Sequence, residues 1–341
     1  MSSHYREHEL AFRTQYAELK ERAQAAGNLL PGSPGSLAKR NGTGLSYWYR
    51  IYYPTPGKAK EQFVCKDGDK ALLAAMQNQI AFQEWMAQQV SDLRKLGFQV
   101  ADKSVARVLV ELHNQQAFSA GLVLVGTLAY MAWLNELGII ATSARTQDID
   151  LARRQSLKLA APLSFIATMQ ATGLPFEEIP SLPATEPATS VKLPGAQGLR
   201  VDLLAPGPDL GKTIKIPELA WAAQTIPYFD YLLDHAEPGA VLAGRHCIPV
   251  RLPQAPRFVW HKLYSSTQRK GFAEKAAKDQ HQALLLATHI AETESHLLRQ
   301  AFDAAPVAMT KLIKPIRKKL LQSASKTAPP ELAATLEECL G

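Results

Sequence analysis

The chain has 341 residues, 46% hydrophobic and 20% charged, a composition typical of soluble globular proteins with room for two or three domains. No apolar run reaches the roughly 18–20 residues of a membrane span, and the N-terminus is polar, so we expect a cytoplasmic protein with no membrane partner. Three widely separated cysteines predict neither a disulfide framework nor a thiolate zinc site. The net charge of +7 favours polyanionic partners, although any basic surface gives such a charge.

The first 100 residues are predicted to form helices around an aromatic β-hairpin. Apolar spacing predicts helices over residues 5–26 and 70–96, and Gly97 stands where a C-cap glycine belongs. Between them, residues 44–66 interleave aromatic and basic side chains, which can stack on bases and neutralise phosphates. The candidate nucleic-acid contacts are Arg40, Trp48, Tyr49 and Arg50. The alternative is that these aromatics are strand residues that pack on the neighbouring helices.

Residues 101–205 have a mixed helical and strand character. The apolar run Leu122–Val125 predicts a buried strand that ends in Gly126-Thr127 before a helix. Predicted helices cover residues 103–118, 128–137 and 156–171, and predicted strands cover residues 122–125, 148–151 and 200–203.

Residues 206–341 are predicted to be largely helical. Helices are expected over residues 217–236 and 256–298, with a strand at 246–252 between them and a basic segment at 311–326 after them.

Three carboxylates and a glycine turn carry the chemistry. Asp148 and Asp150 are two residues apart on a predicted strand, so their side chains share one face, and Asp202 can join them if its strand is a neighbour. Carboxylate oxygens are the ligands that Mg²⁺ or Mn²⁺ prefers, and two such ions can clamp the attacking and leaving oxygens of a phosphoryl centre. Gly126-Thr127 at a helix N-terminus offers backbone donors to phosphates. Each feature alone is common; their order is informative.

With this order the sequence resembles the DNA polymerase β-like nucleotidyltransferase superfamily, and within it a bacterial branch. The residues that carry the resemblance are Leu122–Tyr130, Thr146–Leu151, Arg200–Leu203, Phe258–Leu263, Arg269 and Lys275–Asp279. Two departures stand out. Thr127 replaces the usual Gly or Ser, and the connection from Gly126 to Asp148 is long enough to need an insertion such as residues 138–145.

The resemblance implies a fold and a set of roles. The fold is α+β (mixed α/β), a small mixed sheet flanked by helices, with an N-terminal region at 1–100, a catalytic core at 101–205 and a helical region at 206–341 that closes the nucleotide cleft. The catalytic residues and metal ligands are Asp148, Asp150 and Asp202. The nucleotide-binding residues are Gly126, Thr127, Lys262 and Arg269.

Several of these residues have plainer interpretations. Lys262 can equally be a surface lysine whose stem covers apolar neighbours, and Asp279 can either orient a basic residue or pair with Lys275. Arg153-Arg154 can meet an acceptor or triphosphate, or only end a strand. The three histidines spaced by eight and seven residues are too far apart to chelate one metal ion, and we interpret them as structural. They are His281, His289 and His296.

The expected activity is metal-dependent transfer of a nucleoside monophosphate from a nucleoside triphosphate to a hydroxyl acceptor, with release of pyrophosphate. RNA, including tRNA, is the first candidate acceptor and predicts a basic path from the hairpin to the carboxylates. A small-molecule or protein acceptor predicts an enclosed pocket and activity that survives deletion of residues 1–66. A third alternative is a non-catalytic nucleic-acid-binding module on a degenerate core, which the three retained carboxylates disfavour.

Overall fold

The protein is described by a computed structural model over residues 5–55, 57–141, 146–181, 183, 185–327 and 330–341. Its helices are α1 (Leu10–Ala25), α2 (Lys70–Lys95), α3 (Lys103–Asn114), α4 (Gly126–Glu136), α5 (Phe165–Ala171), α6 (Phe229–Leu233), α7 (Ala255–Gln268), α8 (Ala273–Asp303), α9 (Val307–Ile313), α10 (Arg317–Thr327) and α11 (Pro330–Leu340). Single 3-10 turns are η1 (Pro217–Leu219) and η2 (Lys314–Ile316). The mixture of helices and small sheets confirms the predicted α+β class.

Within the described residues the strands form four separate sheets. They are β1 (Arg6–Glu7), β2 (Ser36–Asn41), β3 (Ser46–Thr55), β4 (Lys58–Lys66), β5 (Leu122–Val125), β6 (Ile139–Ile140), β7 (Asp148–Arg153), β8 (Glu177–Glu178), β9 (Ser190–Lys192), β10 (Arg200–Pro206), β11 (Thr213–Ile216), β12 (Trp221–Ile226), β13 (Glu237–Ala243) and β14 (His246–Leu252). The largest sheet has the order β11-β12-β10-β7-β5, with β9 on the free part of β10 and β8 beyond it.

The centre of this sheet is built from three strands whose inner faces are apolar. β7 and β10 are parallel neighbours, and β5 is antiparallel to β7. Alternation along β7 and β10 buries Ile149, Leu151, Val201 and Leu203 on one face, each 0% exposed, and leaves the polar residues on the other face. The same alternation therefore supplies the core and displays the carboxylates.

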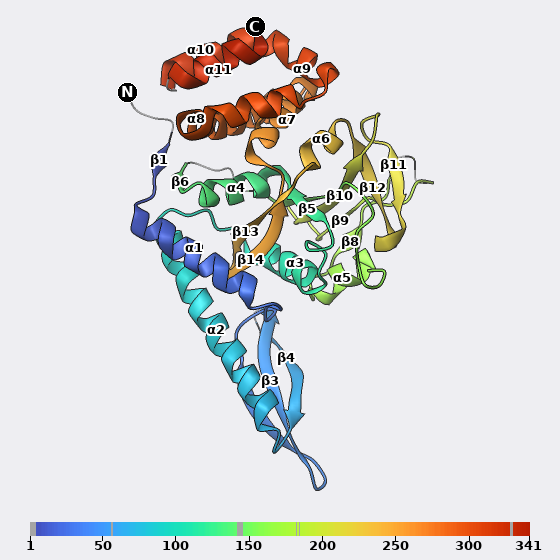
Figure 1. Cartoon of the computed structure of the whole chain (residues 1–341). Coiled ribbons are helices and arrows are strands. Elements are labelled where there is room, and N and C mark those ends of the chain that lie inside the picture. The colour runs from blue at the N-terminus through green and yellow to red at the C-terminus, as the bar shows by residue number, and fades with distance from the viewer. Residues whose placement is uncertain (1–4, 56, 142–145, 182, 184, 328–329) are drawn as a thin grey trace.

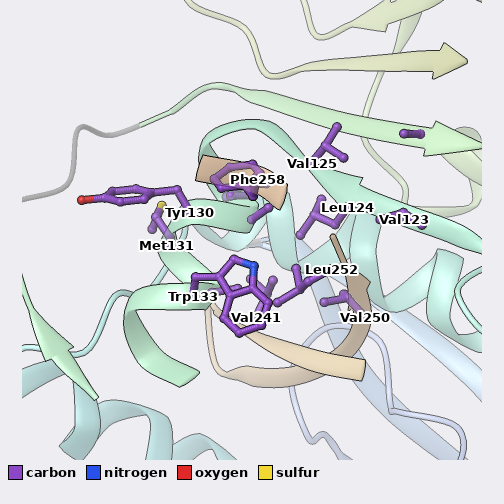
Figure 2. Packing of buried hydrophobic residues seen from close by; sticks show 14 of the residues in the cluster. Val123, Leu124, Val125, Tyr130, Met131, Trp133, Val241, Val250, Leu252 and Phe258 are labelled. Carbon is purple, nitrogen blue, oxygen red and sulfur yellow. The ribbon is translucent and has the colours of Figure 1, made fainter. Parts of the chain in front are cut away.

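The main core lies between this sheet, helix α4 and the hairpin β13–β14. Figure 2 shows Val123, Leu124 and Val125 of β5 beside Val250 and Leu252 of β14, with Trp133 of α4 next to them. Trp133 donates its indole N–H to the backbone oxygen of Pro253 at 3.0 Å, so its one polar group is satisfied inside the core. Phe258 brings α7 onto the same cluster, which anchors the C-terminal helices to the sheet.

The N-terminal region departs from a simple hairpin. A third strand, β2, pairs with β3, and β3 pairs with β4, so the sheet has three strands. We call this sheet, β2-β3-β4, the arm; it projects away from the body of the molecule beside helix α2, on the side opposite the C-terminal helices (Figure 1). Helix α1, which precedes the arm in the chain, packs against the body and buries Tyr16, Leu19 and Ala23 there.

Two helix predictions are wrong in part. Residues 156–164 are not helical, because α5 starts only after Pro162, where the Ser164 hydroxyl caps it by accepting from the Ala167 N–H. Residues 217–236 are mostly not helical either: they form η1, strand β12 and the short helix α6. Trp221–Ile226 joins the sheet because it pairs with β10 and β11, and this tertiary pairing outweighs the local helix propensity.

The remaining helices and strands lie close to their predicted positions. Helix α2 ends just before Gly97, whose φ of +97° matches the expected C-cap role. Of the proposed insertion at 138–145, residues 139–140 form β6, which pairs with β1, and residues 142–145 lie outside the described part of the chain. Among the described residues, no helix is long and apolar enough to cross a membrane.

Candidate active site

A cleft of about 460 Å³ lies between the sheet and the C-terminal helices α7 and α8. One wall is the polar face of β7 and β10 together with the N-terminus of α4, and the opposite wall is α7 and the start of α8. Asp148, Asp150 and Asp202 line the first wall, and Lys262, Arg269, Lys275 and Lys278 line the second. The cleft thus sets carboxylates against cations, which suits a ligand that carries both a metal ion and phosphates.

The sheet register brings the carboxylates together. Asp202 of β10 lies directly beside Asp150 of β7 in the parallel pair, and Asp150 lies opposite Val125, the last residue of β5. Asp148 lies two residues before Asp150 on the same strand, so the two side chains share one face, and Asp148 is exposed. The three aspartates that the sequence singled out are therefore neighbours on one face of the sheet. The turn at Gly126 lies beside them, because Gly126 directly follows Val125, the strand partner of Asp150.

The carboxyl group of Asp150 has a pKa raised to about 7, from an ordinary value of 3.8. Burial is the largest cause, and the neighbouring carboxylates Asp202 and Asp148 raise the pKa further. Lys262 and Arg269 act in the opposite direction and offset only part of this shift. Burial and the two neighbouring carboxylates thus favour the protonated form of Asp150 in the absence of a metal ion.

Gly126 has a residue-specific reason to be glycine. Its φ is +69°, a conformation that side chains rarely adopt, and a Cβ at this position would collide with the carboxylate of Asp150. The backbone turn thus passes directly against Asp150. Thr127 follows in the first turn of α4, is 8% exposed and lines the cleft. The first N–H groups of a helix have no intrahelical acceptor, so this end of α4 can donate to a bound anion.

Asp202 is held by two residues that sequence reasoning missed. Its Oδ1 accepts hydrogen bonds from the Ser190 hydroxyl of β9 and from the Arg200 guanidinium, whose Nε lies 2.8 Å away. Arg200 also donates to Ser190 at 2.9 Å, which closes a three-membered network. Arg200 was recognisable, because it lies two residues before Asp202 on the same face of the strand. Ser190 was not, since it reaches the site only through the pairing of β9 with β10.

Lys262 and Arg269 are joined by one buried carboxylate. Lys262 Nζ lies 2.7 Å from Asp279 Oδ1, and Arg269 Nε lies 3.2 Å from Asp279 Oδ2. The side chains of Lys262 and Asp279 are 9% and 7% exposed. Lys262 is therefore not a surface lysine, and Asp279 orients basic residues of α7 instead of pairing with Lys275. This pair fixes the cationic wall of the cleft to helix α8.

Lys278 is a further cation of this wall that the sequence did not single out. Burial and the nearby Lys262 lower its pKa, while Asp279, Asp148 and Asp150 act to raise it. Lys275, at the rim, lies over the Phe272 ring at 5.5 Å. One helical turn of α8 thus brings two ammonium groups, those of Lys275 and Lys278, into the same cleft as the carboxylates.

Aromatic side chains line the deeper part of the cleft. His261 packs against Phe229 and Tyr264, with ring centroids 5.1 and 5.5 Å apart. Burial lowers the pKa of His261 to about 4, so the ring is neutral near pH 7. Its Nε2 lies 3.4 Å from the Pro227 carbonyl oxygen. These rings give the cleft an apolar end beside the charged one.

The other candidates lie away from the cleft. Arg40, Trp48, Tyr49 and Arg50 belong to the arm, and Arg50 needs correction as a nucleic-acid contact. Its side chain is 0% exposed, and its guanidinium donates to the carbonyl oxygens of Pro31, Ser33 and Pro34. Burial lowers its pKa to about 10, which still leaves it charged. Arg50 ties the base of the arm together.

The arginine pair and the three histidines lie outside the cleft lining. Arg153 pairs with Glu218 at 2.7 Å, and Arg154 pairs with Asp234, so neither points to a triphosphate. His281 and His296 are exposed, whereas His289 is buried with its Nδ1 3.1 Å from the Tyr5 hydroxyl. The wide spacing on one helix keeps the three histidines apart.

The donor set of the sheet wall fits a hard divalent cation in chemistry and in charge. Adjacent strands supply carboxylate oxygens, and burial with the two neighbouring carboxylates raises the pKa of Asp150, a shift that a bound cation would oppose. Within the described part of the chain, no three metal-ligating side chains already converge on one point. Asp202 accepts from Arg200 and Ser190 through Oδ1, so Oδ2 is the oxygen that it would offer to the ion.

Comparison with known proteins assigns the class. The model of the NTP_transf_8 family, described as nucleotidyltransferase, matches residues 103–306, well over half of the chain. The chain belongs to this nucleotidyltransferase family, and the protein is a transferase enzyme with nucleotidyl transfer as its general activity. The matched region runs from α3 to the end of α8 and contains both walls of the cleft, whereas the arm lies outside it. No curated protein matches the chain closely enough to count as a relative.

Proposed function

We propose that the protein transfers a nucleoside monophosphate from a nucleoside triphosphate to a hydroxyl acceptor at this cleft. The observation that carries the proposal is the alignment of Asp150 and Asp202 on parallel strands beside the Gly126 turn, opposite the buried Lys262. The order of these segments along the chain also supports a relationship to the DNA polymerase β-like superfamily. In the reaction the acceptor oxygen forms a bond to the α-phosphorus while the bond from that phosphorus to the bridging oxygen of pyrophosphate breaks.

Asp148, Asp150 and Asp202 are the proposed ligands of Mg²⁺ or Mn²⁺. When bound, the metal neutralises charge on the phosphates and orients the reacting oxygens. The three carboxylates provide hard oxygen donors on one strand face, and Asp150 is buried enough that its negative charge lacks a full counterpart. Asp202 also accepts the proton of the attacking hydroxyl, a role for which its bonds to Ser190 and Arg200 hold it in place.

The remaining residues of the cleft bind the triphosphate. Gly126 and Thr127 donate from the N-terminus of α4, where the turn gives the phosphates close access to the backbone. Lys262 and Arg269 neutralise the far end of the triphosphate, and Asp279 keeps both cations aimed into the cleft. Charge that develops on the departing pyrophosphate therefore meets groups that are positioned before the reaction starts.

RNA is the acceptor that we propose, with tRNA among the candidates. The net charge of +7 supports an anionic macromolecule, and much of that charge lies outside the catalytic region. A small-molecule or protein acceptor is the competing proposal, and it gives a different product in the experiment below.

The experiment is label transfer from each α-labelled nucleoside triphosphate with Mg²⁺ and either total RNA or total protein. We expect label in the RNA, loss of transfer on addition of a chelator, and at least a hundredfold lower rate for Asp150→Asn. Asp230→Asn is the matched control, because the Asp230 side chain is 73% exposed and lies outside the cleft lining. Label that Asp150→Asn transfers at the wild-type rate would refute the site, and label only in protein would refute the RNA acceptor.

A further inference from the structure

One face of the arm carries three aromatic rings, of which Phe63 is exposed and Tyr47 and Tyr49 are partly buried. Tyr47 and Tyr49 of β3 point to the same side because they are two residues apart, and Phe63 of β4 lies opposite Tyr49 in the register. The Phe63 ring is 6.1 Å from the ring of Tyr47 and 5.7 Å from that of Tyr49, and 54% of Phe63 is exposed. We call these three residues the aromatic face.

The opposite side of the arm is already occupied by contacts within the chain. Trp48 lies across from the buried Cys65 and donates its indole N–H to Asp67 at 3.1 Å. Arg50 on the same side is fully buried and bonded to backbone carbonyls. The two sides of one strand therefore differ: Trp48 and Arg50 hold the arm together, while the aromatic face leaves a large apolar side chain exposed without a structural need for it.

Two cations, Arg40 and Lys66, border the aromatic face. Residues 31–70 carry seven Lys or Arg, among them the buried Arg50 of the opposite side, and three Asp or Glu, a net charge of +4 out of +7 for the whole chain. Lys66 is exposed opposite Tyr47, and Arg40 lies opposite Tyr47 on the other neighbouring strand. Arg40 pairs with Glu61 at 2.5 Å, with side chains 53% and 45% exposed. Exposed pairs of this kind contribute little, so the guanidinium can exchange Glu61 for a phosphate.

We propose that the aromatic face binds a single-stranded segment of RNA, with bases stacked on Tyr47, Tyr49 and Phe63 and phosphates held by Arg40 and Lys66. Stacking requires unpaired bases, because a duplex hides the faces of its bases from side chains. A protein partner fits less well, since the centres of protein interfaces are depleted of charge, whereas cations here border the rings on both neighbouring strands. The proposal rests on the proposed function and deepens it, because it narrows the RNA acceptor to a single-stranded segment and says where that segment docks.

The position of the arm gives this contact a role separate from catalysis. Helix α2, which runs beside the arm, has 26 residues and is therefore about 39 Å long. Figure 1 shows the arm on the side of the body away from the helices that close the cleft. An RNA held on the aromatic face is consequently selected at a distance from the reacting phosphorus, and changes on this face alter acceptor binding without touching the cleft.

The test is fluorescence anisotropy of the full-length protein with a labelled single-stranded oligonucleotide, as RNA, as DNA of the same sequence and as an RNA duplex. We expect Phe63→Ala and Tyr49→Ala each to weaken RNA binding about tenfold, within the range for loss of one stacked base. Leu72→Ala is the matched control, because Leu72 is 53% exposed on the neighbouring helix α2. Lys66→Gln should lower the slope of log affinity against log salt by about 0.7, while Lys318→Gln on α10 leaves it unchanged.

Three results would overturn the proposal: wild-type affinity in the combined Tyr49→Ala and Phe63→Ala variant, equal binding of duplex and single strand, or no binding of the oligonucleotide at low salt. Preferential binding of DNA over RNA would overturn the choice of RNA. Asp150→Asn separates this inference from the proposed function, since we expect it to bind the oligonucleotide as tightly as wild type. If Asp150→Asn loses label transfer but still binds the oligonucleotide, the defect lies in the cleft. If the arm variants keep both label transfer and oligonucleotide binding, the RNA site on the arm is refuted and the proposed function is not.

Discussion

At Gly126 the backbone conformation and the position of the Asp150 carboxylate both require glycine. Gly126→Ala places a methyl group in a left-handed conformation and against the Asp150 carboxylate. Gly27→Ala is a matched control, because Gly27 has the same φ of +69° but nothing within 4 Å of its would-be Cβ. We expect Gly27→Ala to cost about 1 kcal/mol of unfolding free energy, and Gly126→Ala about 2 kcal/mol more. Displacing Asp150 should also lower the transfer rate at least about a hundredfold.

Urea unfolding measures the first part of this prediction and label transfer the second. Equal stability losses in the two glycine variants would mean that Asp150 does not lie against the turn.

Asp150 gives the metal-free protein a defined pH dependence. Its folded-state pKa of about 7 lies above its ordinary value of 3.8, so the folded state holds a proton that the unfolded state releases between these values. The contribution of Asp150 to stability is therefore present at pH 4 and is lost as the pH rises through 7. Asp150→Asn should lack this loss and gain about 2–4 kcal/mol over wild type between pH 4 and pH 8, at about 1.4 kcal/mol for each unit of pKa shift.

The measurement is the unfolding free energy of both proteins across this pH range in the presence of a chelator. Mg²⁺ should restore wild-type stability at pH 8 and leave Asp150→Asn unchanged. A constant difference between the two proteins from pH 4 to pH 8 would contradict the raised pKa.

At the scale of elements, the sequence predicted best where one local signal decides the structure. The apolar run of β5 and the alternation in β7 and β10 specify buried strands whatever their neighbours are. Strand β12 failed because its Ala and Leu-rich surroundings favour helix, and only its pairing with β10 and β11 makes it a strand. The start of α5 failed although Pro162 and the capping Ser164 were visible, because the Leu and Lys residues before them suggested an earlier start.

The contact between α7 and α8 makes a prediction at this scale. Asp279→Ala leaves Lys262, which is buried, without its carboxylate partner, and such a loss costs about 3–5 kcal/mol. Replacing both partners, as Lys262→Met with Asp279→Leu, should recover most of that stability because no unpaired charge stays buried. The double variant should still bind nucleoside triphosphate poorly, since the phosphate-facing cation is gone.

Thermal unfolding and nucleotide titration of the two variants give the two readouts. Lys311→Met serves as the control, because Lys311 is exposed on α9 and is not among the residues that line the cleft. Wild-type affinity for the nucleotide in the folded double variant, Lys262→Met with Asp279→Leu, would show that Lys262 does not contact the phosphates.

For the whole molecule, the sequence predicted the residues of the sheet wall better than their partners. Asp148, Asp150 and Asp202 were visible as a motif, whereas Ser190 and Lys278 reach the cleft only through the pairing of β9 and the packing of α8. Arg50 was misread because alternation on a strand does not say which side is buried. Strand periodicity gives two faces, and only the third strand and the loop at 31–34 decide between them.

The N-terminal region also contributes to the core of the protein. Helix α1 contributes Tyr16, Leu19 and Ala23 to the buried core, and Tyr16 donates to Glu136 of α4 at 2.8 Å. Deletion of residues 1–66 should therefore lower the thermal midpoint by well over 10 °C or prevent cooperative unfolding, because several large buried side chains lose their partners. A deleted protein with the wild-type midpoint would contradict this packing. Point variants of the arm are for this reason the sharper way to separate acceptor binding from catalysis.

The central claim is that the carboxylates of β7 and β10 hold the divalent ion that accompanies the nucleotide. Titration with Mn²⁺ in the presence of a nucleoside triphosphate, followed by the electron paramagnetic resonance signal of the free ion, tests this claim without needing an acceptor. We predict that Asp150→Asn binds Mn²⁺ at least about tenfold more weakly than wild type, a loss of about 1.4 kcal/mol, and that Asp230→Asn binds it as wild type does. Equal Mn²⁺ affinity in wild type and Asp150→Asn would contradict the account.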